Sequence, residues 1–337
     1  MQSLLSDNLP PMTATPFPKD ALGRQVDYLR ISVTDRCNER CLYCLPAGFH
    51  DWLPREKVLT LAEIIAVAET AVRMGVKRFR VTGGEPTARK EIVEIIAALA
   101  SLPGVEHVSM TSNATRLKKL AAPLRAAGLH SLNISLDALD LDRYHAITGG
   151  HLPDVLAGID AAIAAGFQIK LNTVLIRGKT EDQIPKLIDF GEEKNIPIRF
   201  IELMPISSAA MLDGDHFLSI REVKTKLGEL HPIQRSYGSG PAKYFHLAGR
   251  KVILGFIGAL TDLHFCERCN KMRLTCEGQL RPCLGNHQET DLMPALRPSI
   301  NQDLLTQLFL ETLATKPAGH IFRDNYQPHR IMTAIGG

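Results

Sequence analysis

The chain has 337 residues, 45% of them hydrophobic and 22% charged, so it can bury a large core and is not intrinsically disordered. This length allows one large α/β domain or two ordinary ones. The 39 basic and 36 acidic side chains give a net charge of +3, which excludes a protein that coats nucleic acid through its overall charge. We therefore expect no nucleic-acid partner, and an anionic ligand must be bound by locally placed arginine and lysine.

The first part of the chain carries four prolines up to Pro18, and residues 1–22 are expected to form a flexible lead-in. This segment has neither the basic start nor the apolar run of a secretory signal. No stretch approaches the roughly 18 apolar residues of a membrane span, so no membrane association is expected. The seven cysteines gather in two places, and the predicted location is the cytoplasm, where reducing conditions keep thiols free.

Residues 23–217 repeat one unit, a β-rich run followed by an amphipathic helix. Alternation of this kind predicts parallel strands joined by helical crossovers. Six strands are too few for a closed eight-stranded barrel, so the predicted α/β fold is a partial (β/α)6 TIM-like barrel with one open side. The expected strands are 29–34, 78–82, 108–111, 132–136, 169–176 and 198–203, and the expected helices are 61–74, 91–102, 117–127, 153–165 and 181–194.

Residues 218–337 break this alternation. A helix is expected over 220–230, short strands over 243–247 and 251–257, and a further helix over 302–314. We predict that this part forms a C-terminal α+β layer that covers the open side of the barrel. The expected organisation is therefore a lead-in (1–22), a barrel (23–217) and a C-terminal region (218–337).

Three cysteines follow the first predicted strand in the pattern Cys37-x-x-x-Cys41-x-x-Cys44. A [4Fe–4S] cluster needs four ligands, so three thiolates leave one iron without a protein ligand. Such an open position can bind and activate a small molecule, as at other catalytic metals. A structural zinc site or cysteines that only pack are the alternatives, although zinc sites usually pair two C-x-x-C motifs.

Polar residues stand where the other predicted strands end, which is the edge that carries function in such barrels. Thr111 ends the third strand and Ser135 the fourth, while Gly83-Gly84-Glu85-Pro86 follows the second. Glycine lets a ligand approach the backbone closely, because it has no Cβ. On its own, however, this segment could equally be an ordinary strand-to-helix turn.

A second group of cysteines comprises Cys266, Cys269, Cys276 and Cys283. Taken alone, these four thiolates are compatible with a tetrahedral structural zinc. Cys276 precedes a probable hairpin turn at Glu277-Gly278, so it could simply pack. The spacing therefore leaves open whether four thiolates hold zinc or three hold a second cluster.

Taken together, these motifs resemble those of the GTP 3′,8-cyclase family, within the radical S-adenosylmethionine (SAM) superfamily. The resemblance extends from Gly23 to the end of the chain. It rests on the cysteine loop with its Gly-Gly-Glu-Pro partner, on the segments 28–37, 132–137 and 199–202, on a C-x2-C-x13-C motif, and on the final Gly336-Gly337.

The resemblance implies two [4Fe–4S] clusters, one bound by Cys37, Cys41 and Cys44 and the other by Cys266, Cys269 and Cys283, with Cys276 a bystander. It implies that SAM binds through Tyr43, Gly84, Ser135 and the main chain of Met204. It implies that GTP binds through Arg30, Arg80, Thr111, Lys170, Lys271, Met272 and Arg273. The residues it implicates in catalysis are Arg273, Gly336 and Gly337.

In this family a 5′-deoxyadenosyl radical from SAM abstracts the 3′ hydrogen of GTP, and the ribose radical attacks C8 to give 3′,8-cyclo-7,8-dihydro-GTP. This is the first step of molybdenum cofactor biosynthesis. The resemblance implies an electron donor of the flavodoxin or ferredoxin type, a homodimer, and transfer of the product to cyclic pyranopterin monophosphate synthase.

Three residues depart from the family pattern. Lys271 replaces the usual arginine, which makes a bidentate phosphate contact a single-point one. Ala114 replaces a glycine, which argues against a left-handed turn there. Glu39 occupies a place that is more often apolar. Two other function classes remain open: a radical SAM peptide maturase with an auxiliary cluster, and a metal-free or zinc-bearing barrel that only binds a nucleotide or a protein.

Overall fold

The computed structural model describes residues 18–45, 48–206, 215–234, 237–238, 240–324 and 326–336. Twelve strands form one sheet in this part of the chain. They are β1 (Tyr28–Ser32), β2 (Arg78–Thr82), β3 (His107–Ser112), β4 (Ser131–Ser135), β5 (Gln168–Leu175), β6 (Ile198–Glu202), β7 (Leu230–Pro232), β8 (Lys243–Leu247), β9 (Ile253–Ile257), β10 (Lys271–Leu274), β11 (Gln279–Arg281) and β12 (Thr290–Asp291).

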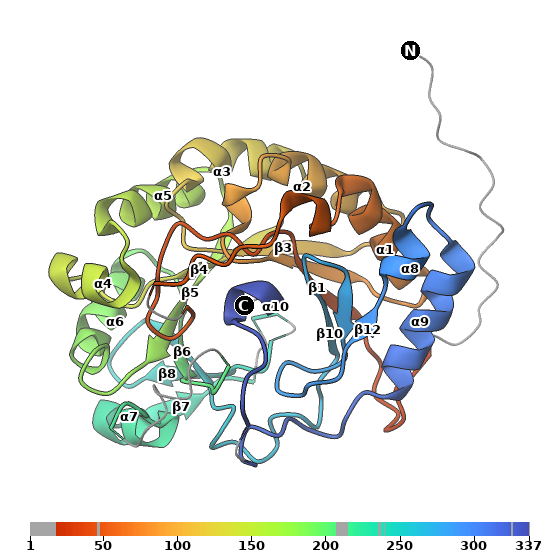
Figure 1. Ribbon diagram of the computed structural model, residues 1–337. Helices are drawn as coiled ribbons and strands as arrows, with labels where there is room; N and C mark the ends of the chain where they lie inside the picture. Colours follow the sequence, from red (N-terminus) through yellow and green to blue (C-terminus); the bar gives the residue numbers. More distant parts are fainter. Residues whose placement is uncertain are drawn as a thin grey trace.

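The sheet has the order β12-β11-β10-β1-β2-β3-β4-β5-β6-β9-β8-β7. Each neighbouring pair from β10 to β9 is parallel, and the pairs outside them are antiparallel. Among the described strands β9 and β10 do not pair with each other, so the sheet curves into a barrel that stays open (Figure 1). The predicted partial barrel is confirmed.

Helices cover the outer face of the sheet, as Figure 1 shows for α1 to α6. Thr60 begins the first of them with a capping box in which its side chain accepts from the backbone of Glu63. The α-helices are α1 (Leu61–Arg73), α2 (Ile92–Ser101), α3 (Leu117–Ala126), α4 (Leu141–Thr148), α5 (Leu152–Ala164), α6 (Ile184–Glu193), α7 (Ile220–Leu227), α8 (Met293–Leu296), α9 (Gln302–Ala314) and α10 (Met332–Ile335), and short 3-10 turns lie at Arg55–Lys57, Pro86–Ala88 and Glu181–Gln183.

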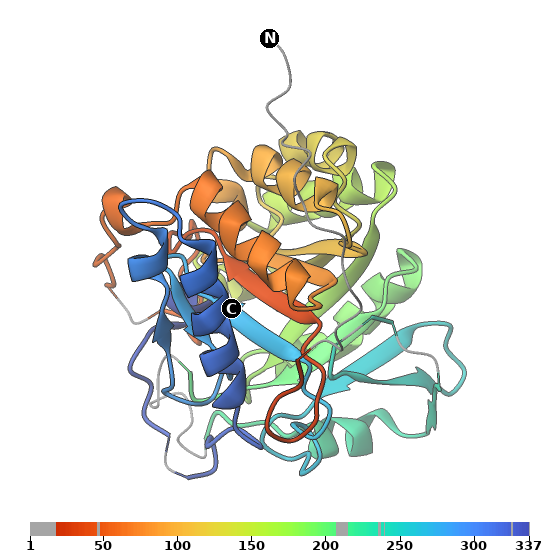
Figure 2. The same ribbon diagram turned by 90° about the vertical axis from the view of Figure 1, so that its right-hand side faces the viewer.

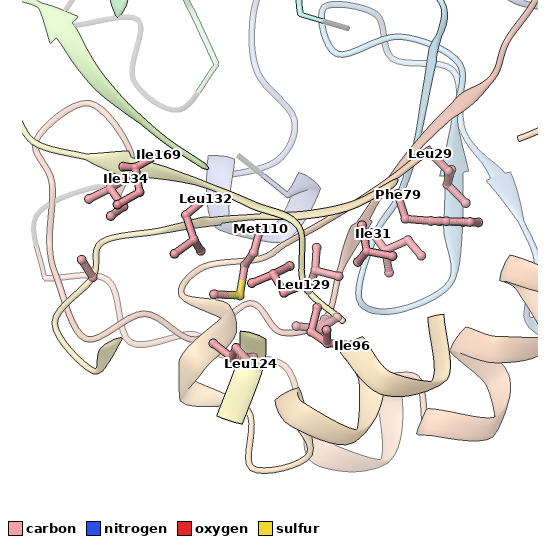
Figure 3. Packing of buried hydrophobic residues seen from close by; sticks show 14 of the residues in the cluster. Leu29, Ile31, Phe79, Ile96, Met110, Leu124, Leu129, Leu132, Ile134 and Ile169 are labelled. Atoms are coloured by element: carbon pink, nitrogen blue, oxygen red, sulfur yellow. The ribbon is translucent and has the colours of Figure 1, made fainter. Parts of the chain in front are cut away.

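The core lies between these helices and the outer face of the strands (Figure 3). In β1 the fully buried Leu29 and Ile31 point into this core. The residue between them, Arg30, points to the other face and lines the interior of the barrel, because side chains alternate along a strand. The same alternation gives the interior its polar character.

The C-terminal region contributes more to the barrel than a covering layer. Strand β10 pairs with β1, and β9 pairs with β6, so the two edges of the six-stranded unit each gain a parallel strand. Strand β10 has only four residues and directly follows the second cysteine motif, which explains why the sequence pattern did not indicate it. The division of the chain at residue 217 stays a prediction.

The end of the chain returns to the barrel. The short helix α10 lies inside the ring of strands in Figure 1, and Figure 2 shows α9 against the side of the sheet. Ile335 packs with Ile206, Phe322 and Tyr326 in a small apolar cluster separate from the main core. No helix of the described residues has the length and apolar character needed to cross a membrane.

Candidate active site

A cavity of about 830 Å³ occupies the barrel at the carboxyl ends of the parallel strands. All six cysteines of the two predicted trios line it, although the trios are more than 220 residues apart in sequence. We call Cys37, Cys41 and Cys44 the first trio, and Cys266, Cys269 and Cys283 the second trio. The described residues therefore bring both sets of thiols to one chamber.

The first trio lies on the loop that follows β1. This loop is fixed to the end of α4, because the N–H groups of Arg40 and Leu42 donate to the carbonyls of Thr148 and Ile147, at 2.7 and 3.0 Å. Burial is the main influence on these thiols. It raises the pKa of Cys37 to about 12 and raises those of Cys41 and Cys44 as well.

Three buried carboxyl groups surround the first trio. Glu39 accepts a 2.8 Å hydrogen bond from the Tyr144 hydroxyl, and Asp137 accepts one of 2.7 Å from the Tyr43 hydroxyl. Burial raises the pKa of Glu39 to about 7 and that of Asp137 to about 6, and it also raises the pKa of Glu85. This part of the cavity is acidic, which suits a ligand that carries positive charge.

The segment Gly83-Gly84-Glu85-Pro86 packs against the backbone of the cysteine loop. A Cβ on Gly84 would lie 2.4 Å from the carbonyl oxygen of Arg36, so the two backbones approach more closely than any other residue permits. The Glu85 carboxylate accepts from Thr87, Ser112 Oγ and Asn113 N, which joins the ends of β2 and β3. This glycine thus has a structural requirement as well as its predicted role toward SAM.

The second trio gathers around β10 and β11. Backbone N–H groups donate to its sulfur atoms: His320 to Cys266, Lys271 to Cys269, and Gly285 to Cys283. Burial acts to raise the pKa of Cys269, but the charges of Lys316 and Lys271 outweigh it and lower that pKa. This trio therefore lies in a basic environment.

Cys276 lies apart from the second trio. It is fully buried, is not among the residues that line the cavity, and its carbonyl accepts from Leu59 N at 2.8 Å. Its thiol interacts with Ser32, at the end of β1. The geometry fits a cysteine that packs.

Six cations share the inner face of the barrel. Arg30 is directly opposite Arg80 on one neighbouring strand and Arg273 on the other. Burial, and then repulsion between the cations, lowers the pKa of Arg30, Lys170, Arg199, Lys271 and Arg273, for example to about 10 for Arg273. Burial also acts to raise the pKa of Tyr28, but the adjacent guanidinium groups lower it to about 8. The cations are Arg30, Arg80, Lys170, Arg199, Lys271 and Arg273.

Several buried polar atoms on this face have no hydrogen-bond partner among the described residues. Two nitrogens of Arg199, Nε and Nη2, and the side-chain oxygens of Asn133 and Asn172 have no hydrogen-bond partner. All three residues line the cavity. Since leaving such groups unpaired is costly, a ligand with both anionic and hydrogen-bonding groups fits this region.

The remaining predicted residues are placed as follows. Thr111, Ser135 and Met204 line the cavity, as do Tyr43 and Gly84. Lys170 lies on β5, where burial together with the charges of Arg199 and Arg80 lowers its pKa to about 8. The side chain of Met272 packs in the hydrophobic core, so a contact of this residue with a ligand would have to be made by its backbone.

The tail meets the cations directly. Arg273 Nη1 donates to the carbonyl oxygen of Gly336 at 2.7 Å. Gly336 has a φ of 73°, and a Cβ there would lie 3.0 Å from Thr82 Cγ2, so the sterically permitted residue is glycine. The predicted tail therefore reaches the site through Gly336, while Gly337 lies outside the described residues.

The expectation at Ala114 is wrong. This residue is buried and has a φ of 66°, so the left-handed turn forms without glycine. Its N–H donates to Ser112 Oγ at 2.9 Å, and its carbonyl packs where a Cβ on Gly158 would be 2.0 Å away. Local hydrogen bonding and packing hold the strained conformation.

Sequence reasoning did not single out Lys316, Asp137 or Arg24 as residues of the site. Lys316 contacts Cys269 Sγ at 3.6 Å, and Arg24 Nη1 donates to the Cys266 carbonyl at 3.1 Å. Asp137 belongs to the segment that ends β4, so its place at a strand end was the available signal. The two cations follow no motif, and only the folded chain brings them to the cysteines.

Within the described residues, no group of three or more His, Cys, Asp or Glu side chains is arranged around the position of a single metal ion. Both trios supply three thiols, which is the donor type that iron–sulfur clusters take. The acidic surroundings of the first trio suit the positively charged SAM. The residues present thus fit the groups that the sequence implied.

Two family models match the chain. The model of the Radical SAM superfamily matches residues 31–191, and that of Molybdenum Cofactor Synthesis C matches residues 196–322. The first contains the end of β1, the first trio and strands β2 to β5. The second contains the second trio and strands β6 to β12.

Curated relatives match over nearly the whole chain. A GTP 3′,8-cyclase of Thermodesulfovibrio yellowstonii is 42% identical over 95% of this chain and 100% of its own length. GTP 3′,8-cyclase 1 of Pseudomonas aeruginosa is 44% identical over 94% of this chain and 98% of its own.

Solved structures show the same fold at lower identity. SuiB of Streptococcus suis, crystallised with S-adenosylmethionine, has a TM-score of 0.58 at 16% identity, covering 83% of this chain and 65% of that one. Native anSMEcpe with bound AdoMet has a TM-score of 0.53 at 15% identity, covering 86% of this chain and 81% of that one.

Proposed function

The chain belongs to the GTP 3′,8-cyclase family of the radical SAM superfamily, and we propose that it converts GTP to 3′,8-cyclo-7,8-dihydro-GTP, the first step of molybdenum cofactor biosynthesis. The observation that carries the proposal is the shared cavity, which has an acidic cysteine trio on one side and a basic trio on the other. Separate acidic and basic regions suit an enzyme that binds a cationic cofactor and an anionic substrate in the same cavity.

The first trio is the proposed ligand set of a [4Fe–4S] cluster that binds SAM. When bound, this pair would supply the 5′-deoxyadenosyl radical that abstracts the 3′ hydrogen of GTP. Tyr43 lines the cavity, and its hydroxyl donates to Asp137, which supports its proposed place beside the adenine of SAM. Gly84, Ser135 and Met204 line the same region.

The second trio is the proposed ligand set of a second [4Fe–4S] cluster, with an iron that faces the purine of GTP. Its three thiols border the cation-lined interior, where the guanine and the triphosphate would lie. The backbone donors and basic side chains around the trio favour thiolates, the form that binds iron; they lower the pKa of Cys269 and partly offset the burial that raises the pKa of Cys266 and Cys283.

The cations are the proposed binding site of the triphosphate. Guanidinium groups match phosphate oxygens in pairs, and Arg30, Arg80 and Arg273 are neighbours across three strands. The burial of these guanidinium groups costs free energy that an anionic ligand would recover. The contact between Arg273 and the Gly336 carbonyl orients both the guanidinium and the tail toward the substrate.

Several properties of the family remain proposals for this protein. We propose a cytoplasmic location and a homodimer, an electron donor of the flavodoxin or ferredoxin type, and cyclic pyranopterin monophosphate synthase as the next enzyme. Size measurement in solution and coupled assays with each purified partner test these points.

The activity test uses the anaerobically reconstituted protein with SAM, a low-potential reductant and GTP. We expect 5′-deoxyadenosine and the cyclised nucleotide to form together, and with GTP but not ATP. The amount of cyclised nucleotide is the deciding measurement, because uncoupled SAM cleavage gives 5′-deoxyadenosine alone. Equal 5′-deoxyadenosine with and without GTP, and no cyclised nucleotide, would contradict the proposal.

A further inference from the structure

A buried lysine sits at the centre of the second trio. The Lys316 side chain is only 4% exposed. Its ammonium donates to the carbonyl oxygens of Lys271 and Pro282, each at 2.7 Å, and contacts Cys269 Sγ at 3.6 Å. An ammonium has three hydrogens, so these three acceptors satisfy it completely.

The two carbonyls belong to the segments that carry the trio. Pro282 directly precedes Cys283, and Lys271 begins β10 two residues after Cys269. One side chain therefore joins two cysteine-bearing segments from different strands. Without it, both carbonyls would lose a charged donor in a buried place, which costs about 1–3 kcal/mol for each group left unpaired.

The residues that follow Lys316 reach the third cysteine. The backbone N–H of His320 donates to Cys266 Sγ, and a Cβ on Gly319 would lie 3.7 Å from this sulfur, at ordinary van der Waals distance. Arg24 closes the arrangement, since it donates to the carbonyls of Cys266, Pro317 and Ala318. The segment 316–320 thus contacts all parts of the second trio.

The charge of Lys316 is buried beside the trio, with its ammonium 3.6 Å from Cys269 Sγ. No carboxylate of the described residues forms an ion pair with it. A buried ammonium without a counter-charge is costly, so the site is completed by a ligand set that is negative.

We propose that Lys316 is a positioning residue for the second cluster, holding the segments of Cys269 and Cys283 in register and balancing the negative charge of three thiolates and their iron–sulfur ligand. It touches neither GTP nor SAM in this role. The inference rests on the second cluster of the proposed function. Removing a residue that hydrogen-bonds to the ligands of a metal commonly lowers metal affinity by about 10–100-fold.

The test uses the full chain with Cys37, Cys41 and Cys44 changed to alanine, so that iron reports on the second trio alone. Lys316→Met removes the charge and the donors while keeping an unbranched side chain of similar size. Lys316→Arg keeps the charge. Lys226→Met is the matched control, because Lys226 is exposed and pairs only with Glu181 on the surface.

After anaerobic reconstitution, each protein is exposed to a ferrous-iron chelator and the rate of iron release is recorded. We expect release about tenfold faster for Lys316→Met, a smaller increase for Lys316→Arg, and the parental rate for Lys226→Met. The electron paramagnetic resonance spectrum of the reduced cluster should change in Lys316→Met, and its midpoint potential should become more negative because a nearby positive charge is lost.

A parental release rate and an unchanged spectrum in Lys316→Met would overturn the inference while leaving the second cluster in place. Absence of iron from the parent would overturn the second cluster, and this inference with it. Should circular dichroism show that Lys316→Met does not fold, Lys316→Arg decides: release at least threefold faster supports the inference, and the parental rate overturns it.

Discussion

The two cysteine trios line one cavity in opposite electrostatic surroundings. Around the first trio stand the buried carboxyl groups of Glu39, Glu85 and Asp137, and burial raises the pKa of its thiols. Around the second stand buried cations, and the pKa of Cys269 is lowered. Cysteine is therefore placed in two different environments, one that suits a cationic cofactor and one that suits an anionic substrate.

The largest expected effect comes from a substitution that disturbs packing at the first trio and leaves the second trio intact. Gly84→Ala would force a Cβ to within 2.5 Å of the carbonyls of both Asp35 and Arg36, which are backbone atoms that cannot move aside. We expect a loss of about 3 kcal/mol in the free energy of unfolding, at the upper end for overpacking. Iron measured after reconstitution should fall mainly at the first trio.

Gly240→Ala is the control for this change, since the nearest atom to its new Cβ is 3.9 Å away and belongs to a flexible side chain. It should unfold at the same denaturant concentration as the wild type. Full iron content and unchanged stability in Gly84→Ala would show that the cysteine loop does not require glycine at this position.

The next prediction concerns the basic side. Arg273→Ala removes a buried guanidinium and its contact with the Gly336 carbonyl. We expect GTP binding to weaken by about 10–100-fold, the range for a lost charged hydrogen bond, while SAM binding changes much less. Calorimetry with each ligand measures both, and exposed Arg143→Ala serves as the control. Equal losses for the two ligands would argue against separate acidic and basic regions.

The two regions should also respond to pH with opposite sign. The pKa of Asp137 is raised by burial to about 6, so the folded state binds the extra proton, and the free energy of unfolding falls as pH rises from 3.8 to 6. The pKa of Lys170 is lowered by burial to about 8. Here the unfolded state binds the extra proton, and the free energy of unfolding rises between pH 8 and 10.5.

Urea unfolding of the metal-free protein across this pH range tests both signs. Asp137→Asn should remove the fall in the free energy of unfolding between pH 3.8 and 6, and Lys170→Met the rise between pH 8 and 10.5, each on the order of 2 kcal/mol. A change in the same limb for both variants would contradict the assignment of opposite environments.

The sequence predicted the parts of this arrangement that depend on local patterns. Strands β2 and β8 and helix α9 have the expected bounds, and β1 and β3 to β6 differ from expectation by one or two residues at their ends. The first trio was indicated by its spacing, whereas at the second group of cysteines the spacing left zinc or a cluster open, and the family resemblance selected Cys266, Cys269 and Cys283.

The parts that sequence did not reveal depend on distant pairing. Strand β10 forms because it completes an edge beside β1, more than 200 residues earlier. Lys316 reaches the second trio from the end of α9, and the register of β1, β2 and β10 creates the row of arginines. No local pattern encodes these contacts, because they exist only once the sheet has assembled.

The smallest expected effect tests a local departure beside the first trio. Ala114→Gly should stabilise the protein by about 0.5 kcal/mol, because relief of left-handed strain exceeds the added flexibility of glycine in the unfolded chain. Thermal unfolding measures the change. Destabilisation would mean that packing of the buried Ala114 methyl group outweighs its backbone strain.

The iron content of four proteins tests the two-trio account most directly: the wild type, the alanine variants of the first and of the second trio, and Cys276→Ala. After anaerobic reconstitution the account predicts about eight irons per chain in the wild type and in Cys276→Ala, and about four in each trio variant. About four irons in the wild type, with zinc retained by the second trio, would contradict it.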